Sequence, residues 1–253
     1  MTADQYLLGI LAREAVDTGS YSPVRGVIMT LQPMLQAWGN RFLRFVAPSG
    51  SFAKGTANHS GTDIDLFLSL VPETSETLKE IHNQLMIRLR NSGFVPKPQN
   101  VSVNIRVGGY SVDLVPGKQQ NAFSEDHSLY RRKADTWTKT NVQTHINLIA
   151  AAGRHAEIRI LKLWRDQKGL AFPSFYLELT TINALAGCGS ASFADNVWTV
   201  FQYLRDHFGA ARVVDPANTN NVISDDLTQA EKTAIRSAAI NVLGAANWNQ
   251  IVV

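Results

Sequence analysis

Cysteine is almost absent from this chain of 253 residues, and long apolar runs are missing. The one cysteine, Cys188, excludes an internal disulfide framework and a multi-cysteine zinc site. Apolar stretches such as residues 146–152 are far shorter than the roughly 20 residues that a membrane span needs. Asp4 and Glu14 lie where a secretory signal would be apolar. The sequence therefore predicts no membrane association and a cytoplasmic location.

Charged side chains are also few, at 18% of residues, whereas hydrophobic residues make up 45%. This balance excludes disorder as the dominant state and supplies a sizeable core. The formal net charge of +3 is a mild basic excess. Such an excess suits phosphorylated ligands, but it falls well below the charge of a protein that coats nucleic acid.

Apolar periodicity divides the chain into a mixed first half and a helical second half. Three- and four-residue spacings predict two helices within the first forty residues. Further predicted elements of the first half are strands Arg41–Ala47 and Asp63–Leu70, helix Ser75–Asn91, and strands Val101–Val107 and Tyr110–Val115 around Gly108-Gly109. The second half is predicted to hold helices Thr140–Ala152, Arg154–Gln167, Ser174–Leu185, Phe193–Phe208 and Thr228–Leu243.

No strand is predicted from Thr138 onward. Pro116–Thr138 is interpreted as the crossing between the halves, and Val213–Asp226 as a long polar loop. We therefore predict one domain over residues 1–137, with two helices and a mixed sheet, and a helical domain over residues 138–253.

The most informative segment is GSFAKGTANHSGTDID, residues 50–65. Gly50 and Ser51 are predicted to open a short helix, whose unpaired backbone N–H groups and positive dipole end suit a phosphate. Asp63 and Asp65 follow on a predicted strand, where the two-residue period sends both carboxylates to one face. Two like charges held so close favour a divalent cation between them.

A third carboxylate, Asp113, stands in the strand GGYSVDLVPG between Val112 and Leu114. An aspartate opposite two apolar neighbours is unfavourable in a core and reasonable at a site. Three carboxylates from neighbouring strands, beside a Gly-Ser turn, meet the requirements of two-metal phosphoryl transfer. The sequence therefore predicts two Mg²⁺ or Mn²⁺ ions bound by these aspartates.

These residues resemble the signature of the polymerase-beta-like nucleotidyltransferase superfamily. In that signature, Gly and Gly or Ser precede a spacer and then Asp, hydrophobic, Asp or Glu, hydrophobic; here the spacer is the eleven residues 52–62. The resemblance implies that Asp63 and Asp65 bind both metals. It also implies that Asp113 helps to hold the metal that activates the attacking hydroxyl, and that Gly50 and Ser51 contact a nucleoside triphosphate.

The second half of the chain resembles a smaller group within this superfamily. Its segment IRILKLWRDQKGLAFPSFYLEL, residues 158–179, is similar to one shared by oligoadenylate synthetases, cyclic GMP-AMP synthase and bacterial CD-NTases. The resemblance implies that Lys162 and Ser174 bind the triphosphate and that Phe175 stacks on the base. Lysine is a compact phosphate counter-charge and an aromatic ring suits a nucleobase, but these residues would also serve as a solvated charge and a core ring.

The segment VVDPANTNNVIS, residues 213–224, resembles the Asp-Pro loop of oligoadenylate synthetases and archaeal CCA-adding enzymes. Asp215, Asn218 and Asn221 are its matching polar positions, and the resemblance implies nucleotide contacts for them. The alternative is simple turn and cap formation, for which Asp and Asn are equally suited.

Together the resemblances imply an α+β, two-lobed nucleotidyltransferase fold. A small mixed β-sheet N-terminal lobe would carry the aspartates, pack against an α-helical C-terminal lobe, and hold the nucleotide in the cleft between them. The expected reaction joins NTPs with release of pyrophosphate, giving a cyclic or short linear oligonucleotide second messenger in bacterial antiviral signalling. The identity of the NTPs, whether ATP, GTP, UTP or CTP, stays open, and a protein activator is allowed.

Three other functions are weighed against this one. Template-independent addition of nucleotides to RNA, as in CCA-adding or poly(A)-type enzymes, is disfavoured by the mild charge and by the absence of a tail domain after Val253. Nucleotidylation of a protein or a small molecule is disfavoured by the long helical second half. A nucleotide-sensing relic has no support, because all three carboxylates are present.

Overall fold

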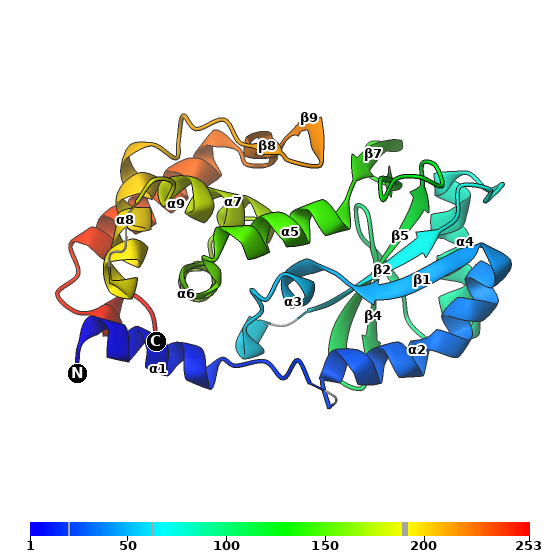
Figure 1. Cartoon of the computed structure of the whole chain (residues 1–253), viewed down its shortest axis with the longest axis horizontal. Coiled ribbons are helices and arrows are strands. Elements are labelled where there is room, and N and C mark those ends of the chain that lie inside the picture. Colours follow the sequence, from blue (N-terminus) through cyan, green and yellow to red (C-terminus); the bar gives the residue numbers. More distant parts are fainter. Residues whose placement is uncertain (20, 62, 189–191) are drawn as a thin grey trace. The chain divides into compact units, whose positions relative to one another are not determined.

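The computed structural model describes residues 1–19, 21–61, 63–188 and 192–253. The chain folds into two compact units, each described by itself (Figure 1). The sheet unit comprises Val16–Lys54 and Thr62–Ile146, and the helical unit comprises Met1–Ala15, Gly55–Gly61 and Asn147–Val253. The first helix and the loop after the Gly-Ser turn thus join the helical unit. The division at residue 137 stays a prediction about domain boundaries.

The sheet unit is built on one mixed sheet. Its elements are α2 (Pro23–Gly39), β1 (Leu43–Pro48), α3 (Gly50–Ala53), β2 (Ile64–Leu70), α4 (Leu78–Asn91), β3 (Lys97–Pro98), β4 (Val103–Val107), β5 (Tyr110–Gln119), β6 (His127–Arg131) and β7 (Thr136–Thr140). The order is β1-β2-β5-β4-β3, with β6 between β5 and β7. The β2–β5 pair is parallel and the other pairs are antiparallel. The parallel pair brings the two predicted aspartate strands side by side.

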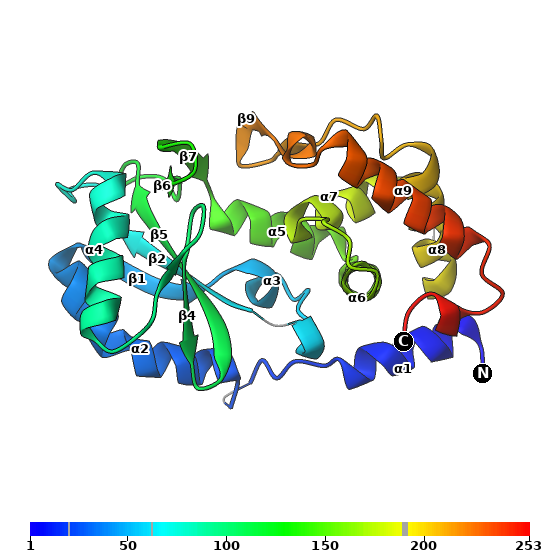
Figure 2. The ribbon, with the colours of Figure 1, turned by 180° about the vertical axis from the view of Figure 1, so that it is seen from behind.

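Side chains divide between the two faces of this sheet. Alternate residues of β2, Ile64, Leu66 and Leu68, are completely buried and pack with residues of α2 and α4 such as Leu31 and Leu85. Figure 2 shows both helices beside the sheet. Because successive residues of a strand point to opposite faces, the other residues of β2 lie on the face that these helices do not cover.

The helical unit has its own core. Its helices are α1 (Ala3–Arg13), the end of α5 (Val142–Ala152), α6 (His155–Gln167), α7 (Ser174–Ala184), α8 (Phe193–Asp206) and α9 (Gln229–Leu243). Between α8 and α9 lie β8 (Val214–Asp215) and β9 (Asn218–Val222). Short 3-10 turns occur in the sheet unit at Asn40–Phe42, and in the helical unit at His59–Gly61, Ile223–Asp226 and Trp248–Gln250. Trp164, Tyr176, Phe201 and Phe208 are its largest buried side chains. No helix in the described ranges is both long and apolar enough to cross a membrane.

The predicted helices and the first strands are confirmed, but two predictions about later segments are wrong. The Pro116–Thr138 crossing contains the end of β5, all of β6 and the start of β7, and the Val213–Asp226 loop contains the β8–β9 hairpin. β7 reads TWTKT and β9 reads NTNNV, and the two show little burial. Apolar alternation identifies only strands that bury one face, so these polar strands gave no signal.

Candidate active site

The Gly-Ser turn is fitted against β2. β1 ends at Pro48, and the backbone N–H of Ser49 donates to the carbonyl oxygen of Asp65 at 2.8 Å. Gly50 then opens α3 with a φ of +56°, in the left-handed region. A Cβ at residue 50 would lie 1.7 Å from Asp65 Oδ2, closer than any two such atoms can stand. Glycine is therefore required here by conformation and by space.

Two of the three aspartates lie on one face of the sheet, and the third stands just before β2. Asp65 and Asp113 are direct partners in the parallel β2–β5 pair, so both side chains leave the sheet on the same side. Asp63 stands one residue before β2 and is exposed, whereas Asp65 and Asp113 are half-buried. The negative charge of Asp63 helps to raise the pKa of Asp113, so these two carboxylates interact. Strand register thus brings together aspartates that lie about 50 residues apart in the sequence.

Asp113 has two amide partners that sequence reasoning missed. Its Oδ1 accepts from Asn104 Nδ2 at 2.8 Å and from Gln99 Nε2 at 3.2 Å. Burial raises the pKa of Asp113 and the Asp63 charge adds to that effect, while the Asn104 hydrogen bond opposes it. The net effect is a raised pKa, so keeping Asp113 ionised costs free energy in the folded protein. A cation near Asp113 would relieve that cost.

The donor set fits a divalent cation in its chemistry. Carboxylate oxygens are the ligands that Mg²⁺ and Mn²⁺ take, and strand register places two of them, Asp65 and Asp113, side by side. Within the described ranges, however, no three His, Cys, Asp or Glu side chains are grouped closely enough to hold a metal as they stand. The reason is visible in two of them, because Asp65 packs on Gly50 and Asp113 faces its amide partners.

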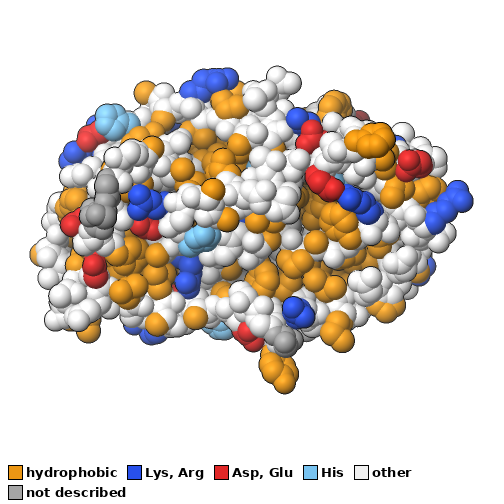
Figure 3. Space-filling view, in the orientation of Figure 1, with side chains coloured by type: hydrophobic (Ala, Val, Ile, Leu, Met, Phe, Trp, Pro, Cys, Tyr) orange, Lys and Arg blue, Asp and Glu red, His pale blue; other side chains and the backbone are white. Residues whose placement is uncertain are grey.

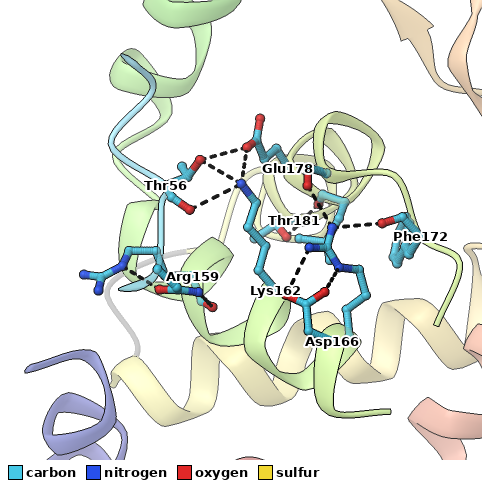
Figure 4. Close-up of polar contacts among 11 residues, drawn as sticks. Thr56, Arg159, Lys162, Asp166, Phe172, Glu178 and Thr181 are labelled. Carbon is cyan, nitrogen blue, oxygen red and sulfur yellow. Dashed lines mark hydrogen bonds and ion pairs between the residues drawn. The ribbon is translucent and has the colours of Figure 1, made fainter. Parts of the chain in front are cut away.

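Lys162, in the helical unit, is buried and forms an ion pair with Glu178 (Figure 4). Its Nζ donates to Glu178 Oε1 at 2.6 Å, to Thr56 Oγ1 at 2.9 Å and to the Thr56 carbonyl oxygen at 3.3 Å. Thr56 Oγ1 also donates to the same Glu178 oxygen at 2.8 Å. The Lys162 side chain is 5% exposed and that of Glu178 is 0% exposed, so the ion pair is shielded from water. Lys162 therefore fixes the loop that begins at Gly55.

That loop is anchored a second time. Asn58 Nδ2 donates to the Arg159 carbonyl oxygen at 2.9 Å, and Arg159 Nε donates back to Asn58 Oδ1 at 3.0 Å. The N–H groups of His59 and Ser60 donate to the Glu14 carbonyl and carboxylate. These contacts hold the loop within the helical unit.

Ser174 and Phe175 open α7. Ser174 is exposed and its Oγ accepts from the Arg165 guanidinium at 2.8 Å, while the same guanidinium nitrogen donates to the Phe172 carbonyl oxygen at 3.0 Å. Phe175 is partly buried against the helical core. Nucleotide contacts for Ser174 and Phe175 stay predictions, and Arg165 is added as a cation that holds Ser174.

The Asp-Pro loop forms a compact hairpin turn. Buried Asp215 accepts from the Ala217 N–H at 2.9 Å and from Asn221 Nδ2 at 3.2 Å. Asn218 Oδ1 accepts from the Asn220 N–H at 3.3 Å. These contacts account for the three polar residues as turn formers, and their nucleotide contacts stay predictions.

Glu178 is the main residue that sequence reasoning missed. It stands in FYLELT, residues 175–180, where a charge among apolar residues near a helix start was a usable signal. Thr56, Asn104 and Gln99 gave no such signal, because ordinary polar residues in loops and strands are common.

The fold and the sequence have known relatives. Cyclic AMP-AMP-AMP synthase of Escherichia coli (strain MS 115-1) is 27% identical over 239 aligned residues, covering 79% of this chain and 74% of that protein. The structure of E. coli MS115-1 CdnC with ATP has a TM-score of 0.79 at 22% identity, covering 99% of this chain and 95% of that one. The CdnC:HORMA-deltaN complex gives 0.78 at 22% identity, with 98% and 94% covered. No protein-family profile matches the chain. The chain shares the fold of these structures over almost its whole length, and the predicted α+β class is confirmed.

Replacing Gly50 with alanine should displace the Asp65 carboxylate and abolish turnover, because the added Cβ meets Asp65 Oδ2. Gly93→Ala is the matched control, since Gly93 also has a positive φ, +85°, with nothing within 4 Å of an added Cβ. Both variants carry backbone strain of about 1–2 kcal/mol. Pyrophosphate release measures the difference, and equal activity in the two variants would remove the space requirement at residue 50.

Asp113→Asn should raise the melting temperature of the metal-free protein at pH 7. The pKa of Asp113 is raised in the folded state, so wild-type stability falls as pH rises through that pKa, and a neutral amide avoids the loss. The gain should vanish below about pH 4, where the carboxyl is protonated in both states. Asp126→Asn, at a carboxyl whose pKa is lowered chiefly by Asn141, should show the opposite sign. A lower melting temperature for Asp113→Asn at pH 7 would contradict the electrostatic account.

Glu178→Gln should cost about 3–5 kcal/mol in free energy of unfolding, because it leaves the Lys162 ammonium buried without its counter-charge. Adding Lys162→Met should restore most of that loss, since an apolar side chain of similar length needs no counter-charge. Urea denaturation of the single and double variants measures both effects. A double variant as unstable as the single one would show that the ion pair is not the source of the loss.

Proposed function

We propose that the three aspartates and the Gly-Ser turn carry out nucleotidyl transfer with two divalent cations, Mg²⁺ or Mn²⁺. In this reaction the hydroxyl oxygen of one nucleotide bonds to the α-phosphorus of a second NTP. The Pα–O bond to the β-phosphate breaks, pyrophosphate leaves, and the hydroxyl proton passes to water or to a carboxylate. The observation that supports this proposal most directly is the side-by-side register of Asp65 and Asp113 next to Gly50.

Each residue of the site has a separate role in the proposed reaction. Asp63 and Asp65 would hold both cations, and Asp113 would hold the one nearer the attacking hydroxyl. When bound, such cations neutralise phosphate charge and lower the pKa of that hydroxyl. The N–H groups at the start of α3 and the Ser51 hydroxyl would donate to the triphosphate. Asn104 and Gln99 orient Asp113 by hydrogen bonds to its Oδ1.

In the helical unit we assign Lys162, Ser174 and Phe175 to the nucleotide. Lys162 would supply positive charge to the triphosphate while Glu178 keeps its position, and Ser174 and Arg165 lie together as hydroxyl and guanidinium donors. Phe175 would stack on the base, which is worth about 1–3 kcal/mol. Asp215, Asn218 and Asn221 would complete the nucleotide contacts from their hairpin.

The proposed product is a small cyclic oligonucleotide, with ATP as the first substrate to test. The supporting observation is the 27% identity to an enzyme named cyclic AMP-AMP-AMP synthase. We further propose activation by a partner protein, because one similar structure is a complex with a HORMA protein.

Incubation with each labelled NTP, alone and in mixtures, with Mg²⁺ or Mn²⁺ tests this function. The expected product is small, resistant to phosphatase and formed without RNA. Asp63→Asn, which changes charge with little change in size, should give less than 1% of wild-type product because it removes a cation ligand. If the protein shows no activity by itself, the incubation is repeated with candidate partner proteins encoded by neighbouring genes.

Product that is long, ribonuclease-sensitive and dependent on added RNA would overturn the proposal in favour of RNA tailing. That alternative has fold support, since a cytoplasmic RNA terminal U-transferase matches with a TM-score of 0.65 at 12% identity. Full activity in Asp63→Asn and Asp113→Asn would instead overturn the assignment of the aspartates.

A further inference from the structure

Uncharged polar residues form a row across the sheet beside Asp113. Asn104 of β4 is the register partner of Asp113 in β5, so both side chains lie on the same face of the sheet. Ser102 precedes Asn104 by two residues and continues the alternation onto that face. The Gln99 N–H donates to the Ser102 carbonyl oxygen at 2.9 Å, which extends the register of β3 with β4 by one pair. Gln99 and Ser102 thus stand opposite each other on the face that carries Asp113.

The backbone of Gln99 is fixed by the β6–β7 turn as well. Its carbonyl oxygen accepts from Arg132 Nε at 3.0 Å. The next residue, Asn100, accepts from the Arg132 N–H at its carbonyl oxygen, at 2.8 Å, and from the Lys133 N–H at its Oδ1, at 3.1 Å. The β6–β7 turn therefore holds the β3–β4 turn in place, and the position of the Gln99 amide depends on its side-chain contacts.

The orientation of the Gln99 amide is set by its two partners. Its Nε2 donates to Asp113 Oδ1 at 3.2 Å, and its Oε1 accepts from the Ser102 hydroxyl at 3.1 Å. A carboxylate only accepts hydrogen bonds, so the amide nitrogen has to face Asp113. A half-turn of the amide would place its oxygen against the carboxylate oxygen. The Ser102 hydroxyl favours the correct orientation because it donates to the amide oxygen.

Burial makes Ser102 the anchor of this pair. Ser102 is 4% exposed, whereas Gln99 is exposed. A buried hydroxyl that loses its partner is costly, so Ser102 keeps its hydrogen bond to Gln99. Water competes for the amide of an exposed glutamine, and fixing such a long side chain costs rotamer entropy. The buried hydroxyl therefore holds an amide that would otherwise leave Asp113 for water.

The groups that hold Asp113 are uncharged. Its hydrogen bonds come from the amides of Gln99 and Asn104. Figure 3 shows charged side chains scattered over the visible face of the molecule rather than gathered in one patch. An amide donor fixes the direction of a carboxylate without neutralising it, so the negative charge stays available to a cation.

We propose that Ser102 is a positioning residue for nucleotidyl transfer, which acts through the Gln99 amide on the direction of the Asp113 carboxylate. The inference rests on the proposed role of Asp113 at the cation nearer the attacking hydroxyl. Loss of the Ser102 hydroxyl leaves the charge of Asp113 and the proposed triphosphate contacts in place. It therefore slows the chemical step and leaves the binding of NTP unchanged.

Ser102→Ala and Gln99→Met test the proposal under the conditions that give product. Each should lower kcat about tenfold with little change in KM, because the partners of a metal ligand contribute about 10- to 100-fold. The double variant should lose no more than the single variants, since both residues act through one chain of hydrogen bonds. Ser22→Ala is the control and should keep the wild-type kcat. Ser22 is a buried serine of the same unit, and its hydroxyl accepts from the Val24 N–H.

A second measurement needs no turnover. In NMR spectra of the metal-free protein, the Gln99 Nε2 proton signals are assigned by their loss in Gln99→Met. They should shift in Ser102→Ala and in Asp113→Asn, and stay in place in Ser22→Ala. Because Gln99 is exposed, Gln99→Met also tests the chain of hydrogen bonds if Ser102→Ala does not fold.

Three results would overturn the positioning role. They are unchanged Gln99 signals in Ser102→Ala, a kcat of Ser102→Ala or Gln99→Met within about twofold of wild type while Asp113→Asn is inactive, and a loss in the double variant equal to the product of the single losses. Full turnover by Asp113→Asn would instead overturn the proposed function and with it the catalytic part of this inference. The NMR comparison would then still show whether Ser102 orients the amide.

Discussion

The candidate site depends on the parallel pairing of β2 with β5, which sets Asp65 directly beside Asp113. Two carboxylates at adjacent positions repel, and burial of Asp113 adds to the cost of its charge. The fold offsets this with the amide donors of Asn104 and Gln99 and by packing Asp65 on Gly50. The amide hydrogen bonds of Asp113 and the packing of Asp65 on Gly50 therefore hold both carboxylates in position within the fold.

The same strands support the fold from their other face. Ile64, Leu66 and Leu68 alternate with Asp65 and are fully buried against helices. Burial of one such side chain is worth about 1.5–3 kcal/mol, so the apolar face supplies the free energy that the charged face costs. A shift of β2 by one residue would exchange the faces and bury the carboxylate. Register is thus fixed by the apolar residues, and the aspartates depend on it.

Sequence reasoning succeeded where a contact is implied by local spacing. The two-residue spacing of Asp63 and Asp65 and the alternation around Asp113 predicted which face of the sheet carries carboxylates. Gly50 predicted the turn before α3. It failed for Glu178, whose partner Thr56 stands 122 residues away, because no local pattern encodes such a pair. It also failed for β7 and β9, whose polar and little-buried residues lack the alternation that marks a half-buried strand. It missed the short strands β6 and β8 as well, although β6 buries His127, Leu129 and Tyr130.

Lys162 was first interpreted from its chemistry as a phosphate counter-charge, and its surroundings change how that role has to be understood. With its Nζ 2.6 Å from Glu178, the ammonium is already neutralised in the folded protein. Removing it leaves a buried carboxylate without its counter-charge, which costs stability whether or not phosphate binds. Loss of nucleotide affinity in Lys162→Ala would therefore not separate a phosphate contact from a displaced Thr56 loop. A variant that neutralises Glu178 at the same time removes the cost of the uncompensated carboxylate, while the loss of the Lys162 hydrogen bonds to Thr56 is common to the single and the double variant.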